Sequence, residues 1–137
     1  MNGRTEVWDT IRGRWLVMTP EEAVRQQVIA YLIEVKQVPP GLIRQEQPLS
    51  LNDTARRADV VAYDHTGKPR MVVECKAPSV PVTRETLEQA VRYNCVLQVP
   101  YIWITNGETN HCFRYHAEEN RYESLREIPD WESLCRD

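Results

Sequence analysis

The sequence predicts an α/β fold, with a central mixed β-sheet flanked by helices in the order α-β-β-β-α-β-β. Three stretches predict it: a helix-start signal with helical spacing near the N-terminus, two β-rich runs around a tight turn in residues 56–76, and a second helix followed by a buried strand in residues 83–105. A strand–helix–strand connection of the last kind is right-handed and joins parallel strands. We expect residues 1–137 to form one domain, because 42% apolar and 27% charged residues are an ordinary globular mixture.

The N-terminal third begins with residues 1–18, which carry Trp8 and Trp15-Leu16-Val17 and which we expect to form a lead-in strand or turn that covers the edge of the core. The first helix then begins at Thr19-Pro20-Glu21-Glu22, a string with an N-cap threonine, a proline at the first helical position and a glutamate where a capping box requires one. Apolar residues follow at helical spacing before the prolines at 39 and 40: Val24, Val28, Ile29, Leu32 and Ile33. Residues 42–49 are the next candidate strand, and their proline indicates a sheet edge or a strand end.

A β-hairpin of residues 56–64 and 70–76 is the centre of the predicted fold. Side chains alternate along a strand, so Glu74 and Lys76 lie on one face. If the turn has four residues, Asp59 lies opposite Glu74, and a shift of two places it opposite Lys76. Either register brings two carboxylates and an ammonium to one end of the hairpin.

The second half of the chain supplies a helix and more strands. Thr83 can cap a helix that runs to about Leu97, and residues 101–105 read as a buried strand. Asn106-Gly107 favours a turn into a returning strand at residues 112–115. A weaker strand near 120–122 and a short docked helix within 128–137 complete the expected elements.

Two carboxylates on a rigid strand pair are suitable ligands for Mg²⁺, and such a metal activates water for attack on a phosphate. A lysine two residues from a ligand can orient that water or stabilise developing charge. The simpler interpretation is a surface hairpin in which Glu74 and Lys76 form a solvated pair. The valines beside the candidate residues favour the functional interpretation, because they indicate a strand that is buried on both faces.

The ordered motif resembles a known family. Asp59 followed by Glu74-x-Lys76 is similar to the PD-(D/E)XK nuclease signature, and the wider strings Arg57-Ala58-Asp59-Val60-Val61 and Val73-Glu74-Cys75-Lys76-Ala77-Pro78 resemble the N-terminal nuclease domain of type I restriction enzyme R subunits. The likeness continues through Gln89-x-x-x-Tyr93-Asn94 and Thr105-Asn106-Gly107 and covers roughly residues 15–115, outside the acidic extension 117–137. Ala58 stands where the signature has proline, a position that carries no chemistry.

The resemblance implies a restriction-endonuclease-like core and a Mg²⁺- or Mn²⁺-dependent deoxyribonuclease, expected to be an endonuclease. Asp59 and Glu74 would hold the metal, and Lys76 would position the attacking water. Gln89 would orient the site, and Glu22 on the first helix would assist. For Glu22 the alternative is a purely capping role, and for Gln89 an ordinary place on an amphipathic helix.

DNA is the expected partner, with Arg57 and Tyr93 as the candidate contacts to it. Other subunits of a restriction–modification system are further candidate partners, and a homodimer would provide the two sites that a double-strand cut needs. No Gly-x-x-x-x-Gly-Lys-Ser/Thr string occurs, so we expect no ATP-driven translocation from these residues. Two alternatives stay open: a non-catalytic DNA-binding or assembly module that retains the nuclease fold, and a metal-independent interaction domain that uses its acidic tail.

Charge and cysteine content leave these possibilities open. The net charge is −3, but residues 117–137 carry −4, so the remainder carries +1. The four cysteines have no Cys-x-x-Cys spacing, which favours reduced, semi-buried thiols over a zinc site. No apolar run approaches the roughly 18 residues of a membrane span, and the N-terminus lacks the apolar core of a signal peptide, so we expect a cytoplasmic protein.

Overall fold

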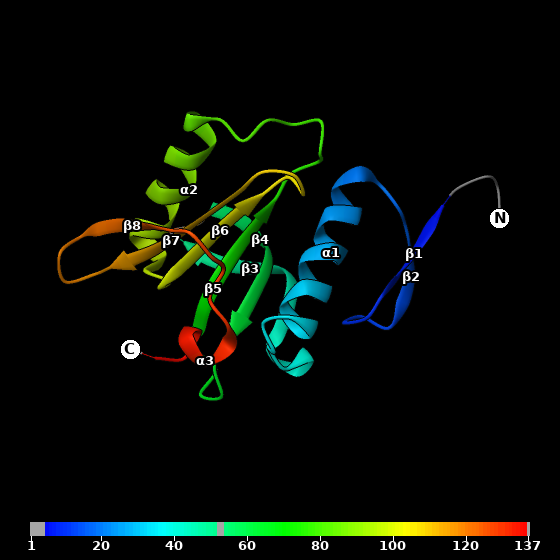
Figure 1. Ribbon diagram of the computed structural model, residues 1–137, viewed down its shortest axis with the longest axis horizontal. Coiled ribbons are helices and arrows are strands. Elements are labelled where there is room, and N and C mark those ends of the chain that lie inside the picture. The colour runs from blue at the N-terminus through cyan, green and yellow to red at the C-terminus, as the bar shows by residue number, and fades with distance from the viewer. Residues whose placement is uncertain (1–4, 52–53, 137) are drawn as a thin grey trace.

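The computed structural model describes residues 5–51 and 54–136, and its centre is a six-stranded mixed sheet (Figure 1). The strands follow one another across the sheet in chain order: β3 (Ile43–Leu51), β4 (Thr54–Tyr63), β5 (Pro69–Cys75), β6 (Tyr101–Thr105), β7 (Asn110–His116) and β8 (Arg121–Leu125). β5 and β6 run parallel, because the helix α2 (Arg84–Leu97) carries the chain back between them, and the other neighbouring pairs are antiparallel. The predicted α/β class and the parallel crossover are confirmed, as is the edge position of β3.

The central hairpin adopts the first of the two registers considered. Val60 pairs with Val73 and the register continues for two more residues, which is the alignment that sets Asp59 against Glu74. A bulge at the turn end then pairs Tyr63 with Pro69, so the predicted partner of Pro69, Asp64, lies in the turn instead. Its carboxylate accepts hydrogen bonds from the turn residues, which explains why the turn takes one residue more than predicted.

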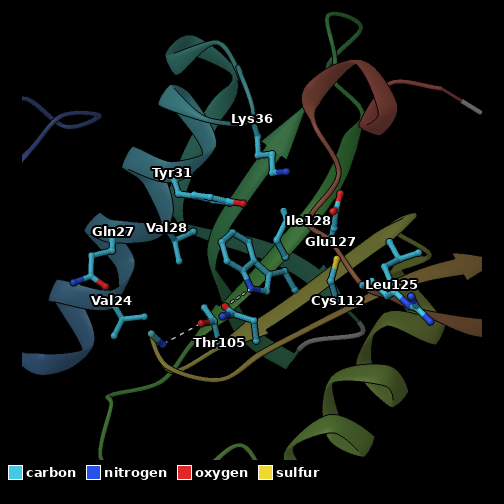
Figure 2. A pocket seen from close by; sticks show the side chains of 14 residues that line it. Val24, Gln27, Val28, Tyr31, Lys36, Thr105, Cys112, Leu125, Glu127 and Ile128 are labelled. Atoms are coloured by element: carbon cyan, nitrogen blue, oxygen red, sulfur yellow. Dashed lines mark hydrogen bonds between the residues drawn. The ribbon is translucent and has the colours of Figure 1, made fainter.

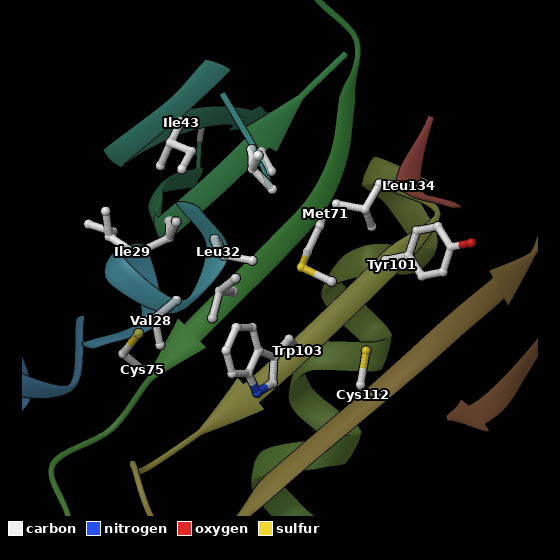
Figure 3. Packing of buried hydrophobic residues seen from close by; sticks show 14 of the residues in the cluster. Val28, Ile29, Leu32, Ile43, Met71, Cys75, Tyr101, Trp103, Cys112 and Leu134 are labelled. Carbon is white, nitrogen blue, oxygen red and sulfur yellow. The ribbon is translucent and has the colours of Figure 1, made fainter. Parts of the chain in front are cut away.

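The helix α1 (Pro20–Glu34) covers one face of the sheet, and a short 3₁₀ turn (Pro40–Leu42) leads from it to β3. Its N-terminus is as predicted, because the Thr19 hydroxyl accepts the Glu22 amide at 3.1 Å. The core on this face combines residues of α1, the central strands and the short helix α3 (Trp131–Leu134) (Figure 3). Its largest members include Val24, Ile29, Leu32, Ile43, Met71, Trp103 and Leu134.

The other face of the sheet is covered by α2, so the sheet lies between two helices (Figure 1). Ala90 of α2 packs against Ile102 and Ile104 of β6, and Thr83 caps the helix by accepting the Thr86 amide at 3.2 Å. Within the described ranges, no helix is both long enough and apolar enough to span a membrane.

A separate β-hairpin precedes α1. Its strands are β1 (Glu6–Asp9) and β2 (Arg14–Val17), and it projects beyond α1, away from the main sheet (Figure 1). Trp8 and Trp15 face each other across it with ring centroids 5.4 Å apart, and they are 47% and 62% exposed. The expected strands are present, but these exposed tryptophans do not cover the core; the hairpin contacts it instead through its turn, where Ile11 packs against the main core cluster.

Candidate functional site

Asp59 joins three elements at the end of the central hairpin. One carboxylate oxygen, Oδ2, accepts a hydrogen bond from the backbone N–H of Cys75 at 2.8 Å. It thus replaces a backbone carbonyl of the neighbouring strand as the acceptor for this N–H. The other, Oδ1, lies 3.2 Å from Nη2 of Arg25 on α1. The carboxylate therefore holds β4 and β5 together where their ladder ends and connects both strands to the helix.

Glu74 and Lys76 lie on one face of the β5 end, as their spacing predicts. The Lys76 Nζ is 3.4 Å from the Glu74 Oε1, and both side chains are partly exposed. Cys75, between them, points into the core on the opposite face, where burial raises the pKa of its thiol far above the ordinary value. The β5 end thus presents one carboxylate and one ammonium, and the hairpin register sets Glu74 opposite Asp59.

Glu22 does more than cap the helix. In a capping box its side chain would reach back to the Thr19 amide, but that amide donates to a backbone carbonyl of β2. The Glu22 carboxylate instead pairs with Nη1 of Arg25 and accepts a hydrogen bond from Gln26 at 3.1 Å. The purely capping interpretation is wrong for the side chain, and Glu22 and Asp59 share one guanidinium group.

Further charged residues extend this arrangement into what we call the carboxylate–arginine cluster: Asp9, Arg12, Glu22, Arg25, Glu46 and Asp59. Arg12, from the turn of the N-terminal hairpin, pairs with Asp9 and lies 3.4 Å from Glu22 and 3.2 Å from Glu46. Four carboxylates face two guanidinium groups, so the cluster has a formal charge of −2, without Glu21, which lies 3.9 Å from Arg25.

The partners of Asp9 and Arg25 favour the charged forms of these two buried side chains. Burial alone would raise the pKa of Asp9, but hydrogen bonds from the Arg12 backbone and side chain and from Gln45 lower it below its ordinary value. Burial alone would likewise lower the pKa of Arg25, but the negative charges of Glu22 and Asp59 raise it. Asp9 and Arg25 are therefore stabilised in their charged forms by the partners that surround them.

Solvent reaches the cluster through a pocket of about 400 Å³ between the N-terminal hairpin and the start of α1. Glu22, Arg25 and Glu46 line it from one side and Arg12 and Arg14 from another. A charged ligand can therefore approach the buried carboxylates without passing through the apolar core.

One predicted site residue, Gln89, lies apart from the cluster, and the side chains of two others are not described. Gln89 is exposed on α2, on the other face of the sheet, and no described hydrogen bond links it to Asp59 or Glu74. The side chains of Arg57 and Tyr93 lie outside the described residues.

A larger pocket of about 640 Å³ opens between α1 and the strands β6 and β7 (Figure 2). Trp103 and Tyr31 form its apolar wall, with ring centroids 5.9 Å apart. The indole N–H donates to Asn110 at 3.0 Å, and the Thr105 hydroxyl accepts the Gly107 amide, so these polar groups are already satisfied. None of the predicted catalytic residues lines this pocket.

The carboxylate oxygens of the cluster are chemically suitable ligands for a hard cation. Carboxylate oxygens are the ligands that Mg²⁺ prefers, and a net charge of −2 is what one divalent ion neutralises. Their present arrangement is not a coordination shell, because both oxygens of Asp59 accept protein hydrogen bonds. Within the described ranges, no three His, Cys, Asp or Glu side chains are grouped closely enough to hold a metal ion.

The sequence analysis missed the two arginines and Asp9. Arg25 precedes Val28 and Ile29 by three and four positions, so it lies on the apolar stripe of α1, and Glu22 is one turn before it. A charged residue on a buried stripe, one turn from an acid, is a signal for a buried ion pair. Arg12 had no such signal, because, apart from Asp9 three residues earlier, its partners Glu22 and Glu46 come from distant segments.

The comparisons with known proteins agree with this architecture. The chain belongs to the family described as the type I restriction enzyme R protein N terminus, which matches residues 20–129. Among solved structures, a fragment assigned to the HsdR subunit of a type I restriction enzyme from Vibrio vulnificus YJ016 has the same fold, with a TM-score of 0.58 and 21% sequence identity. The match covers 85% of this chain and 24% of that one, so this chain spans about a quarter of the length of its structural relative. No curated protein matches the chain.

Proposed function

We propose that this chain is a Mg²⁺- or Mn²⁺-dependent nuclease domain that hydrolyses phosphodiester bonds in DNA, with the PD-(D/E)XK type of active site. The observation that carries the proposal is the register of the β4–β5 hairpin, which sets Asp59 opposite Glu74, together with the 3.4 Å contact between Glu74 and Lys76 at the same end of β5. Membership of the R protein family supports a restriction–modification context, in which DNA is the substrate and other subunits are partners.

Each residue has a role that follows from its chemistry. Asp59 and Glu74 would supply the carboxylate oxygens for the metal, which when bound activates water and neutralises charge on the phosphate. Lys76, 3.4 Å from Glu74 and partly exposed, would donate to the attacking water or to the phosphate oxygens as charge develops. Glu22 would assist from α1, and Gln89 and Tyr93 would act from α2 once DNA is bound.

Cleavage of circular, linear and single-stranded DNA with Mg²⁺, with Mn²⁺ and with a chelator tests this function. The wild-type chain should cut only with the metal, and Lys76→Ala should lower the rate by at least about a hundredfold while the protein remains folded. Lys68→Ala is the matched control, because Lys68 is exposed in the turn of the same hairpin and should be dispensable. Equal activity of the Lys76 and Lys68 variants would remove Lys76 from the mechanism.

One observation favours a second function. Both oxygens of Asp59 are engaged by Arg25 and by the Cys75 amide, as they would be in a DNA-binding or assembly module that keeps the nuclease fold without catalysis. Such a module would bind DNA in the presence of a chelator and would show no heat of Mg²⁺ binding in calorimetry.

A further inference from the structure

We propose that Arg25 is a built-in competitor for the metal: in the metal-free protein its guanidinium group holds Asp59, and cation binding requires Arg25 to release that carboxylate. This inference rests on the proposed nuclease function, because it concerns the same site. It makes Arg25 a positioning residue that sets how tightly the site binds its cation.

The contacts of Arg25 are those of a cation held between ligands. Its Nη2 lies 3.2 Å from the Asp59 Oδ1, its Nη1 pairs with Glu22, and its side chain is only 9% exposed. A planar guanidinium can hold two carboxylates at once from fixed positions. Arg25 thus supplies locally the positive charge that a metal would supply.

One atom of Arg25 indicates that this arrangement is not its optimal one. The buried Nε has no hydrogen-bond partner among the described residues. A buried donor without an acceptor is costly, by about 1–3 kcal/mol in general. The guanidinium group is therefore held at Asp59 with part of its hydrogen-bonding capacity unused, which lowers the cost of moving it.

Two further carboxylates lie close enough to pair with Arg25 if its guanidinium group moves away from Asp59. Glu46 lies 3.5 Å from its Nη1, and Glu21 lies 3.9 Å from its Nη2. Both acids are about half exposed, and Glu46 and Arg25 line the same pocket. A small rotation toward solvent would exchange Asp59 for these acids, so the guanidinium keeps an ionic partner in either position.

Charge favours the exchange. The cluster carries a formal −2 with Arg25 in place, so a divalent cation at Asp59 neutralises it while Arg25 remains paired with Glu22 or Glu46. A divalent cation carries one more positive charge than Arg25, and its stronger attraction to the carboxylates offsets the loss of the Arg25–Asp59 contact. The free energy of metal binding to the wild-type chain is therefore the difference between the cation–Asp59 and the Arg25–Asp59 interaction free energies.

Calorimetric titration with Mg²⁺ and Mn²⁺ of wild-type protein and Arg25→Met tests the inference. The variant should bind the ions about tenfold more tightly or better, because the competitor is gone. Arg25→Lys should lie between the two, because an ammonium keeps the charge but cannot bridge Asp59 and Glu22 at once. Affinity in Arg25→Met equal to or weaker than in wild type would overturn the inference.

Arg12→Met is the matched control. It removes one positive charge from the same cluster but leaves the Arg25–Asp59 contact in place. An equal gain in metal affinity in this control would also overturn the inference, because general charge rather than competition at Asp59 would then explain the effect. If the Arg25 variants do not fold, the guanidinium NMR signals of Arg25 in the wild-type protein test the release instead. These signals should shift when Mg²⁺ is added. Signals that stay unchanged at Mg²⁺ saturation would refute the release of Asp59 by Arg25.

The outcome is separable from that of the nuclease proposal. Cleavage by wild type with unchanged metal affinity in Arg25→Met would refute the competition and leave the nuclease in place. Tight binding by Arg25→Met with neither binding nor cleavage by wild type would support the competition and refute the nuclease. Absence of binding in every variant would refute both.

Discussion

Asp9 has no exposed surface, yet it remains charged because Arg12 and Gln45 donate to its carboxylate. It also accepts the backbone amides of Ile11 and Arg12, so one side chain fixes the turn of the N-terminal hairpin. Through Arg12 this turn reaches Glu22 on α1. Asp9 therefore connects the hairpin to the candidate site by holding Arg12 in place.

We predict that Asp9→Asn lowers the free energy of unfolding by about 2 kcal/mol at pH 7. Removing one partner of a buried ion pair costs about 3–5 kcal/mol in general, and Arg12 is 25% exposed, which reduces that cost. Urea unfolding measures the difference, and Glu118→Gln, an exposed loop residue, should change it by less than about 0.5 kcal/mol.

The pH dependence of the same variant has a definite sign. The pKa of Asp9 is lower in the folded state than its ordinary value of 3.8, so its stabilisation is present above that value and is lost as the pH falls through the folded-state pKa. The gap between wild type and Asp9→Asn should therefore narrow under strong acid. A gap that stays constant down to about pH 2 would contradict this assignment.

Residue patterns predicted some of the site and missed the rest for a physical reason. The alternation of side chains along a strand was enough to put Glu74 and Lys76 on one face, and their 3.4 Å contact confirms it. Arg12 could not be predicted as a site residue, because its partners Glu22 and Glu46 belong to separate segments that only the folded chain brings to the Asp9–Arg12 turn.

Among the elements, α3 shows how the C-terminal extension joins the core. Leu134 is fully buried in the main cluster, and its carbonyl accepts the side chain of the buried Arg70 at 2.5 Å. The Trp131 amide donates to the Lys36 carbonyl after α1. This short helix therefore closes the end of the core between β5 and α1.

We predict that Leu134→Ala lowers the free energy of unfolding by about 3 kcal/mol, because it leaves a cavity in a fully buried position. Thermal or urea unfolding measures it. Val80→Ala is the control at a 41% exposed position and should cost less than about 0.5 kcal/mol. A loss below about 1 kcal/mol for Leu134→Ala would show that α3 is not part of the folded core.

Element boundaries were predictable where a local chemical signal sets them. The caps at Thr19 and Thr83 fixed the starts of α1 and α2, and each hydroxyl accepts the amide three residues on. The bulge at Tyr63 and the position of the N-terminal hairpin were not predictable, because they depend on how the Asp64 turn closes and on where Asp9 is buried.

At the scale of the whole molecule, the sheet topology creates the site. β5 pairs with β6 for two residues beyond Val73, its last pair with β4, so the register sets Asp59 opposite Glu74 at the edge where these strands end. α1 then brings Glu22 and Arg25 against that edge from one face of the sheet. The fold class could be read from the sequence and the hairpin register was narrowed to two alternatives, but the choice between them and the charge balance at this edge required the folded chain.

The central claim is that the carboxylates at this edge hold a divalent cation, and Mg²⁺ calorimetry of wild type against Asp59→Asn tests it most directly. The account predicts saturable binding to wild type and a loss of at least about tenfold in affinity in the variant, with no comparable loss in the exposed-residue control Glu118→Gln. Indistinguishable affinities in wild type and Asp59→Asn would contradict it.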